Sequence, residues 1–319
     1  MFDIVINPYG ATGGALRTWK KIQPVFDENK IEYSVHFSSQ CESITDIVAK
    51  LTMHPCDLMI VGGDGTLNQA VNGIADFEHT RLAMISTGSG NDFARSQNYD
   101  KDPVKHVLKL LHNSEVCLVD VGEVVYHNMS SVSEQTVLCE DGFVHRRFMI
   151  SAGIGFDAAI CHEAQISKWK RVLNILHLGK LIYIVTAIHI IATARRVQGS
   201  VQIGDTKKEY SKLLLAVIMN EPYEGGGFKF CPYASDNDRL LDMCIADHLS
   251  QFDFFRIFPY AYKGGHLKFK GIESLKSEKE IHVKTDEPLW VHTDGETPCM
   301  SSDITVRLYC DKLKLMTYE

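Results

Sequence analysis

The sequence lacks several features that mark particular classes of protein. Its 319 residues carry a net charge of −7, so the broadly basic surface expected of a nucleic-acid-binding protein is missing. The nine cysteines form no Cys-x-x-Cys pair and have no recurring spacing with histidine, which argues against a zinc site and against disulfides. Linkers rich in proline, glycine or serine are also absent, so any second domain is joined compactly. This composition indicates a folded cytoplasmic protein with reduced thiols.

Apolar runs long enough to cross a membrane are absent as well. The most apolar segment, residues 181–194, is shorter than the roughly 18 to 20 residues that span a bilayer, and it contains His189. We therefore expect residues 169–194 to form a buried or half-buried helix, with a lipid-contacting surface as the alternative. The N-terminal residues 1–6 have the pattern of a β-strand and not that of a signal peptide.

The sequence does contain an alternation of strand and helix patterns over residues 1–125. This alternation predicts a Rossmann-like parallel sheet with helices on both faces, in an α/β domain of residues 1–125. Ligands of such sheets bind where the carboxyl ends of strands meet helix N-termini. The expected strands are 2–6, 33–37, 57–61 and 81–86, and the expected helices are 15–28, 42–53, 67–74, 91–96 and 104–112.

From about residue 120 the pattern changes to short strands separated by turns. Asp141-Gly142 and Gly204-Asp205 are turn sequences typical of β-hairpins. We therefore expect a second, antiparallel β-sandwich domain of residues 126–302, with helices inserted at 169–194 and 252–258. Its strands are expected at 136–139, 144–150, 201–203, 212–219, 240–246, 280–284 and 289–292, and the last strands, within about 303–319, are candidates to return to the first domain.

The most specific local pattern is Val-Gly-Gly-Asp-Gly-Thr-Leu-Asn at residues 61–68. An apolar strand stops at two glycines and continues as a helix from Leu67, which places a helix N-terminus against a glycine turn. Such a turn lets backbone N–H groups approach a phosphate, and the helix dipole favours the negative charge. Asp64 would repel a bare phosphate, so we expect a metal ion or a proton-donating hydroxyl between them. The pattern therefore predicts a phosphate-binding site at which a reaction takes place.

Two further turns fall at the same edge of the predicted sheet. The turn at residues 7–14 follows the first strand and is neither a P-loop nor a Gly-x-Gly-x-x-Gly motif. In the turn at residues 86–95, Ser89 and the glycine amides are suited to hold phosphate oxygens, and Asn91 and Asp92 are suited to cap the next helix. Helix capping explains one such turn, but not three turns on one edge.

Taken in order, these motifs resemble the diacylglycerol kinase catalytic domain of soluble bacterial lipid kinases, a group related to NAD kinases and phosphofructokinases. The resemblance covers nearly the whole chain, and the ordered set of motifs is highly specific. It rests on residues 7–8, 62–68 and 88–95 in the first domain and on residues 153–157, 220–234 and 294–296 in the second.

The resemblance implies a two-domain kinase that uses ATP and Mg²⁺ in the cleft between its domains. Glu296 stands at the position of the catalytic base, which takes the proton of the attacking hydroxyl. Asp64 is implied to bind the catalytic Mg²⁺ or to assist the base, with Asp294 as a further catalytic residue. The implied ATP site consists of Asn7, Pro8, Tyr9, Gly10, Ala11, Ser38 or its neighbour Ser39, Gly63, Asp64, Gly65, Thr66, Leu67, Asn68, Gln69 and Ser89.

A second, structural Mg²⁺ site is implied at residues 233–242. Its ligands would be the carbonyl oxygens of Ser235 and Leu240 and the side chain of Asp238, a donor set that suits a hard cation. The sequence departs from the family pattern here, because Arg239 stands in place of the usual glycine and Asn237 in place of the first aspartate. A plain surface turn is therefore the alternative.

The implied reaction is phosphorylation of a lipid alcohol, first of all diacylglycerol, to give phosphatidic acid. The implied partner is a lipid substrate at a membrane surface, met by transient peripheral contact, and Lys168, Lys170, Arg171, Arg195 and Arg196 are candidates to meet anionic headgroups. The alternatives are another acceptor (a sphingoid base, a different glycerolipid or an NAD-like alcohol) and a non-catalytic nucleotide or lipid sensor. The sequence leaves the oligomeric state open, a homodimer included.

Overall fold

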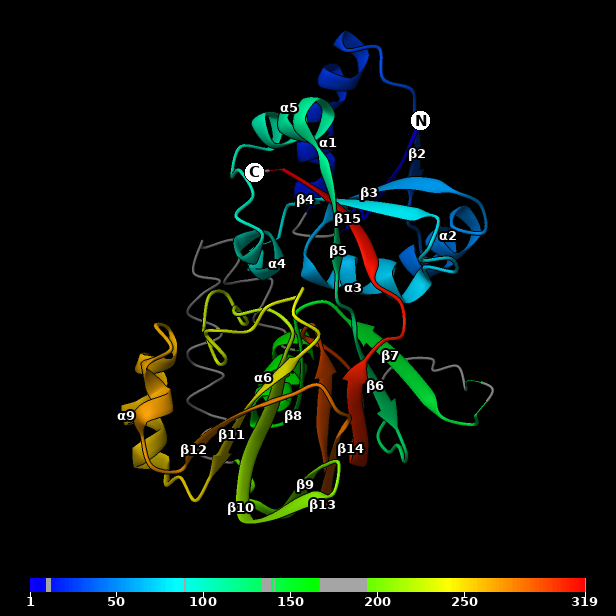
Figure 1. Ribbon diagram of the computed structural model, residues 1–319. Helices are drawn as coiled ribbons and strands as arrows, with labels where there is room; N and C mark the ends of the chain where they lie inside the picture. Colours follow the sequence, from blue (N-terminus) through cyan, green and yellow to red (C-terminus); the bar gives the residue numbers. More distant parts are fainter. Residues whose placement is uncertain (10–12, 89, 133–138, 140, 167–193, 319) are drawn as a thin grey trace.

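The structure, a computed structural model, describes residues 1–9, 13–88, 90–132, 139, 141–166 and 194–318. Figure 1 shows two bodies stacked on each other, with the first sheet and its helices in one and most of the later strands in the other. The predicted combination of a Rossmann-like α/β domain and an antiparallel β domain is confirmed.

The first sheet has six strands in the order β2-β1-β3-β4-β15-β5. All neighbours are parallel except β15 and β5, which are antiparallel. The parallel order brings the carboxyl ends of β1, β3 and β4 side by side. The strands are β1 (Phe2–Ile6), β2 (Tyr33–Phe37), β3 (Cys56–Gly62), β4 (Thr80–Ser86), β5 (Glu115–Val119) and β15 (Leu313–Thr317).

Helices cover both faces of this sheet because successive side chains of a strand point to opposite faces. Ile4 and Ile6 of β1 pack in the core that includes Trp19, whereas Val5, between them, packs in the core that includes Ile47. The helices are α1 (Gly14–Glu28), α2 (Ile44–Leu51), α3 (Asp64–Gly73), the short α4 (Asp92–Ser96) and α5 (Pro103–Asn113).

The second sheet has nine antiparallel strands. Its main order is β12-β11-β10-β8-β13-β14-β6-β7, and β9 pairs with both β10 and β13. One core of apolar side chains, among them Phe148, Ile154 and Val291, lies between these strands. The strands are β6 (Gly122–Tyr126), β7 (Val144–Phe148), β8 (Ser151–Gly155), β9 (Val197–Ile203), β10 (Thr206–Met219), β11 (Leu241–Asp247), β12 (Ile272–Ser277), β13 (Ile281–Thr293) and β14 (Glu296–Leu308).

Two α-helices and one short 3₁₀-helix, η2 (Gly265–Lys268), accompany this sheet in the described part of the chain. Helix α6 (Phe156–Ile166) follows β8 directly, and α9 (Gln251–Ala261) lies at one margin of the second domain, shown in orange in Figure 1. The helix expected at 252–258 is thus part of α9. Most of the helix expected at 169–194, and of the strand expected at 136–139, lies outside the described residues. None of the described helices is long and apolar enough to cross a membrane.

Two strand predictions differ from the structure. Residues 280–284 and 289–292 were expected to be separate strands, but both belong to β13, whose pairing with β14 shifts register between them. Residues 304–309 do not return to the first domain, because β14 pairs with β6 as far as Leu308. Only β15 joins the first sheet, where it lies between β4 and β5.

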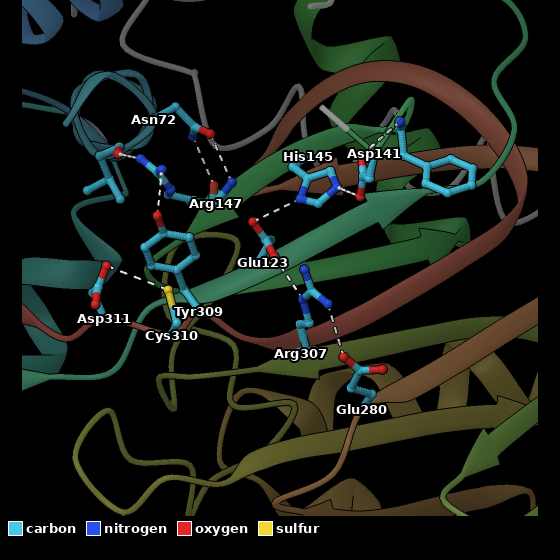
Figure 2. Close-up of polar contacts among 12 residues, drawn as sticks. Asn72, Glu123, Asp141, His145, Arg147, Glu280, Arg307, Tyr309, Cys310 and Asp311 are labelled. Atoms are coloured by element: carbon cyan, nitrogen blue, oxygen red, sulfur yellow. Dashed lines mark hydrogen bonds and ion pairs between the residues drawn. The ribbon is translucent and has the colours of Figure 1, made fainter. Parts of the chain in front are cut away.

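Arg147 of β7 fixes the second domain against α3 (Figure 2). Its N–H donates to Asn72 Oδ1 at 2.8 Å, and its carbonyl oxygen accepts from Asn72 Nδ2 at 3.0 Å. Its guanidinium donates to the carbonyl oxygens of Val71 and Ile74, each at 3.1 Å, where the dipole of α3 is negative, and to the Tyr309 hydroxyl at 3.0 Å. The C-terminal end of α3 is therefore held by the second domain, while its N-terminal end carries Asp64.

Candidate active site

The predicted nucleotide turns meet at the carboxyl edge of the first sheet. The Asn7 N–H donates to the Val61 carbonyl at 3.4 Å, and the Thr87 N–H donates to the Gly62 carbonyl at 2.7 Å. The Ser38 N–H, which follows β2, donates to the carbonyl of Ile6 in β1 at 3.1 Å. The turns after β1, β2, β3 and β4 thus form one continuous edge. Of the predicted ATP residues, Gly10, Ala11 and Ser89 lie outside the described residues.

The predicted residues 66–69 do not all face this edge. Leu67 is buried in the apolar core, so its side chain packs under the sheet and does not line a polar site. The side chain of Asn68 is also buried, and it crosses to the second domain. It donates to Asp294 Oδ2 at 2.9 Å and to the Arg147 carbonyl at 3.0 Å, and its Oδ1 accepts from Arg146 at 3.2 Å. Asn68 therefore joins the domains.

Asp64 lies at the N-terminus of α3 and faces the N-terminus of α4. Its Oδ2 accepts from the Asp92 N–H at 3.1 Å and its Oδ1 from the Phe93 N–H at 3.4 Å. Burial, together with the charge of Asp92, raises the pKa of Asp64 to about 6. A Cβ atom at Gly90 would lie 3.3 Å from Asp64 Oδ2 and 3.4 Å from Asp92 Oδ2, so the two carboxylates converge there. A carboxylate oxygen is a ligand that fits Mg²⁺, and an ion at Asp64 would favour the ionised form of that carboxyl group.

Asp294 holds the turn of residues 294–296, which we call the catalytic turn. Its backbone has a φ of +50°, and both carboxylate oxygens are engaged. Oδ1 accepts from the N–H groups of Ile150 at 2.8 Å and Ser151 at 3.1 Å, and Oδ2 accepts from the Met149 N–H at 3.0 Å and from Asn68. Four donors therefore give Asp294 a holding role in this turn, and its role as a further catalytic carboxylate stays a prediction.

Glu296, the first residue of β14, brings a carboxylate from the second domain onto the first. A Cβ atom at Gly65 would overlap Glu296 Oε1, so the glycine leaves the space that this carboxylate occupies. Gly65 belongs to the first turn of α3, where the helix dipole favours negative charge. The structure thus places a carboxylate beside the predicted phosphate turn.

Sequence reasoning missed the contribution of Arg95. Its guanidinium donates to Asp92 Oδ1 at 2.6 Å and lies over the ring of Tyr223, 5.5 Å from the centroid. The other oxygen of Asp92 accepts from the Gly226 N–H at 2.7 Å. Arg95 ends the motif at residues 88–95, and Gly226 lies in the glycine run at 225–227, so both segments can be recognised in the sequence. Their proximity depends on the packing of the two domains.

The turn predicted to hold a structural Mg²⁺ is occupied by basic side chains instead. Lys276 Nζ lies 2.8 Å from Asp238 Oδ2 and 3.2 Å from Asp242 Oδ2. Arg239 has a φ of +62°, and its N–H and guanidinium donate to Asp120 at 2.7 and 3.2 Å. Because these cations already neutralise the carboxylates, the residues present do not fit a metal ion. Ser235, Asp238 and Leu240 are therefore not suited as its ligands.

Comparison with known proteins connects this geometry to a family. The model of the diacylglycerol kinase catalytic domain matches residues 2–124, and the model of the YegS C-terminal NAD kinase beta sandwich-like domain matches residues 150–317. The chain is 26% identical over 296 residues to a Bacillus subtilis protein named "Putative lipid kinase YtlR", covering 92% of each chain. It is 24% identical over 308 residues to the diacylglycerol kinase of Bacillus subtilis, covering 96% of this chain and 93% of the relative.

A solved structure gives the same picture of the fold. The crystal structure of a "putative diacylglycerol kinase" from Bacillus anthracis superposes with a TM-score of 0.72 at 21% identity, covering 100% of this chain and 97% of the other. The two family models together account for both domains and for every motif described above. The chain therefore belongs to the diacylglycerol kinase family of lipid kinases, enzymes that phosphorylate an alcohol group.

Proposed function

We propose that this protein transfers the γ-phosphate of ATP to the hydroxyl of a lipid alcohol, with diacylglycerol as the first acceptor and phosphatidic acid as the product. The observation that carries the proposal is the contact between Glu296 and Gly65. It brings a proton-accepting group of one domain to the phosphate-binding turn of the other. Phosphoryl transfer to an alcohol requires that a proton-accepting group and the bound phosphate lie within reach of the same hydroxyl.

In the proposed mechanism, the glycine turns after β1, β3 and β4 hold the phosphates, and Glu296 accepts the proton of the attacking hydroxyl. Asp64 would hold Mg²⁺, which would supply neutralising charge to the phosphates during transfer, and Asp92, already paired with Arg95 at 2.6 Å, would lie beside it. Asp294 and Asn68 keep the catalytic turn against α3 by their hydrogen bond at 2.9 Å. Positioning and electrostatics supply the catalysis in this class of reaction.

A lipid acceptor requires contact with a membrane surface, and the exposed side of α9 supports such contact. Phe252, Phe255 and Tyr262 recur at helical spacing and are 76%, 45% and 53% exposed. Lys263 is exposed beside them, in a chain of negative net charge, and Arg256 is exposed as well but forms an ion pair with Asp253 at 3.3 Å. Aromatic side chains flanked by basic ones suit an interface with anionic lipid. We propose α9 as the membrane-facing side of the protein.

The basic residues that the sequence offered for this contact are a weaker choice. Lys168, Lys170 and Arg171 lie outside the described residues. Arg195 forms an ion pair with Glu287 at 2.9 Å, and the Arg196 guanidinium donates to the Leu249 carbonyl at 2.8 Å. Both described arginines are therefore already engaged within the protein.

The test is transfer of labelled γ-phosphate from ATP and Mg²⁺ to lipids in mixed micelles. The panel contains diacylglycerol, monoacylglycerol, phosphatidylglycerol, ceramide and sphingosine, with an NAD-like soluble alcohol and the variant Glu296→Ala as controls. A labelled diacylglycerol that is absent with the variant is the expected result. Label in another acceptor would reassign the substrate, and ATP binding without any transfer would favour a sensor.

A further inference from the structure

A buried cluster of three side chains lies beneath the catalytic turn. His292, near the end of β13, faces Asp157, the second residue of α6, and Glu224, in the loop after β10. His292 Nε2 lies 2.8 Å from Asp157 Oδ2 and 3.1 Å from Glu224 Oε1. His292 is fully buried, and each carboxylic residue is less than a tenth exposed. The proposed mechanism uses none of the three.

The second ring nitrogen of His292 defines the state of the ring. The Gly295 N–H donates to His292 Nδ1 at 3.2 Å, so Nδ1 carries a lone pair and the single ring proton lies on Nε2. Burial lowers the pKa of His292, and the surrounding acidic groups, Glu224 first and Asp157 with it, together raise that pKa well above its ordinary value, but a second proton on Nδ1 would point at the Gly295 N–H. A metal ion on Nε2 would likewise move the proton to Nδ1. The hydrogen bonds therefore correspond to a neutral imidazole, which donates on one side and accepts on the other.

The two carboxyl groups divide their roles around the Nε2 proton. Burial raises the pKa of Glu224, which favours its neutral form. Asp157 Oδ2, at 2.8 Å against 3.1 Å for Glu224 Oε1, is by distance the principal acceptor of the Nε2–H. A buried polar group costs stability unless it is hydrogen-bonded, and this arrangement gives both ring nitrogens of His292 a partner.

Gly153 makes room for this cluster. It is the register partner of His292 in the pairing of β8 with β13. A Cβ atom at Gly153 would overlap the Asp157 carboxylate and would lie 2.6 Å from His292 Nε2. The motif Gly-Ile-Gly-Phe-Asp at residues 153–157 thus serves this contact at both ends. Its last residue, Asp157, is the hydrogen-bond acceptor, and its first residue, Gly153, leaves the space for that carboxylate.

The cluster also reaches the carboxylates of the first domain. Glu224 directly precedes the glycine run at residues 225–227, in which Gly226 donates to Asp92 Oδ2 at 2.7 Å. The Asp92 N–H in turn donates to Asp64 Oδ2 at 3.1 Å. The residues around His292 are therefore connected to the catalytic turn on one side and, through Gly226, to Asp92 and Asp64 on the other.

We propose that His292 is a positioning residue of the catalytic turn, fixing the Gly295 N–H through Nδ1 and tying the turn to α6 and to residues 224–228 through Asp157 and Glu224. It acts through Glu296 and touches no substrate. The proposal rests on the proposed function only in that Glu296 is the group that takes the proton. The hydrogen bond from Gly295 to His292 can be tested without any activity.

Two substitutions separate the two nitrogens of His292. His292→Asn places an amide oxygen near the position of Nδ1 and keeps an acceptor for Gly295. His292→Gln places its amide near the position of Nε2 and leaves the Gly295 N–H without its acceptor. With diacylglycerol in mixed micelles, we expect His292→Asn to keep kcat within about threefold, and His292→Gln to lose roughly 10- to 100-fold in kcat at an unchanged KM for ATP. Equal losses in both variants, or no loss in His292→Gln, would overturn the proposal.

Amide hydrogen exchange at Gly295 provides the second readout. Exchange is expected to be faster in His292→Gln than in the wild-type protein and in His292→Asn, and equal rates in all three would overturn the proposal. Should wild-type protein phosphorylate none of the lipids, the proposed function would fail while this measurement still decides the hydrogen bond. Asp157→Ala, which like His292→Asn removes the Nε2 contact and keeps an acceptor for the Gly295 N–H, serves if the His292 variants do not fold: we expect kcat within about threefold of the wild-type value and wild-type exchange at Gly295, and a loss of about 10-fold or more or faster exchange would overturn the proposal.

Discussion

Gly65 in the first turn of α3 and Glu296 at the start of β14 are in contact across the two domains, because the Glu296 carboxylate fills the space that a side chain at position 65 would take. This contact connects the proposed phosphate turn with the proposed base. The predictions below follow from it and from the groups that surround it.

A methyl group at position 65 should displace Glu296 and slow the reaction. We expect Gly65→Ala to lower kcat by about 100-fold, because a shift of the base by about 1 Å is enough for such a loss. The matched control is Gly265→Ala, since a Cβ atom there would make only ordinary contacts at 3.6 Å and beyond. Steady-state kinetics with diacylglycerol measures both variants, and wild-type kcat for Gly65→Ala would contradict the proposed place of Glu296.

The raised pKa of Asp64 predicts that Mg²⁺-dependent ATP binding depends on pH. The pKa rises from 3.8 to about 6 in the folded protein, so the ionised form is disfavoured there, and nucleotide-free protein should lose stability as pH rises from about 4 to about 6. Mg²⁺ needs the ionised form. We therefore expect calorimetric titration with MgATP to show tighter binding at pH 7 than at pH 5, with weaker binding and a smaller pH dependence in Asp64→Asn. An identical pH dependence in Asp64→Asn would remove Asp64 from the metal site.

Asp294→Asn should destabilise the fold, because an amide cannot accept from all four donors. One N–H of the new amide would face a backbone N–H of residues 149–151. We expect a loss of about 3 kcal/mol in the free energy of unfolding, the scale of one buried hydrogen bond to a charged group. Chemical denaturation measures it, with Asp205→Asn on the exposed turn before β10 as the control. A stable variant that lost only kcat would restore a catalytic role to Asp294.

Lys276 should make the turn at residues 235–240 independent of metal ions. We expect Lys276→Met to lower the free energy of unfolding by about 1 kcal/mol, a modest value because Lys276 and Asp238 are both about a third exposed. Lys270→Met, at another exposed lysine, should have no measurable effect. The wild-type protein without nucleotide should unfold at the same temperature with Mg²⁺ and with a chelator. A lower temperature in the chelator would indicate a bound ion and contradict this reading of the turn.

The exposed side of α9 should contribute to vesicle binding. We expect the double substitution Phe252→Ser and Phe255→Ser to weaken binding to anionic vesicles by at least about tenfold, since a fully buried phenylalanine is worth about 1.5 to 3 kcal/mol. Met53→Ser, at a similarly exposed apolar residue of the first domain, is the control. Co-sedimentation with vesicles measures all three proteins. Equal binding of the double variant and the wild-type protein would place the membrane contact elsewhere.

Local patterns in the sequence were sufficient for much of the fold. The strand, glycine turn and helix at residues 57–74 could be predicted because each depends on neighbours in the chain: an apolar run, residues that permit a tight turn, and helical spacing. The same holds for the parallel sheet, whose alternating elements repeat through the first 113 residues. The single strand β13 was missed because a bulge interrupts its pattern between Lys284 and Leu289.

By itself, the sequence determined which residue types gather at which turn, and through its ordered motifs it indicated a lipid kinase. Only the tertiary structure decided what each carboxylate does. Asn68 and Asp294 are 226 positions apart and share a hydrogen bond, so Asp294 holds a turn while Glu296, two residues later, lies beside Gly65. Lys276 likewise reaches the carboxylates of the turn where a Mg²⁺ ion was predicted only through tertiary packing. Such roles depend on distances between segments that are remote in the chain, and packing of the two domains sets those distances.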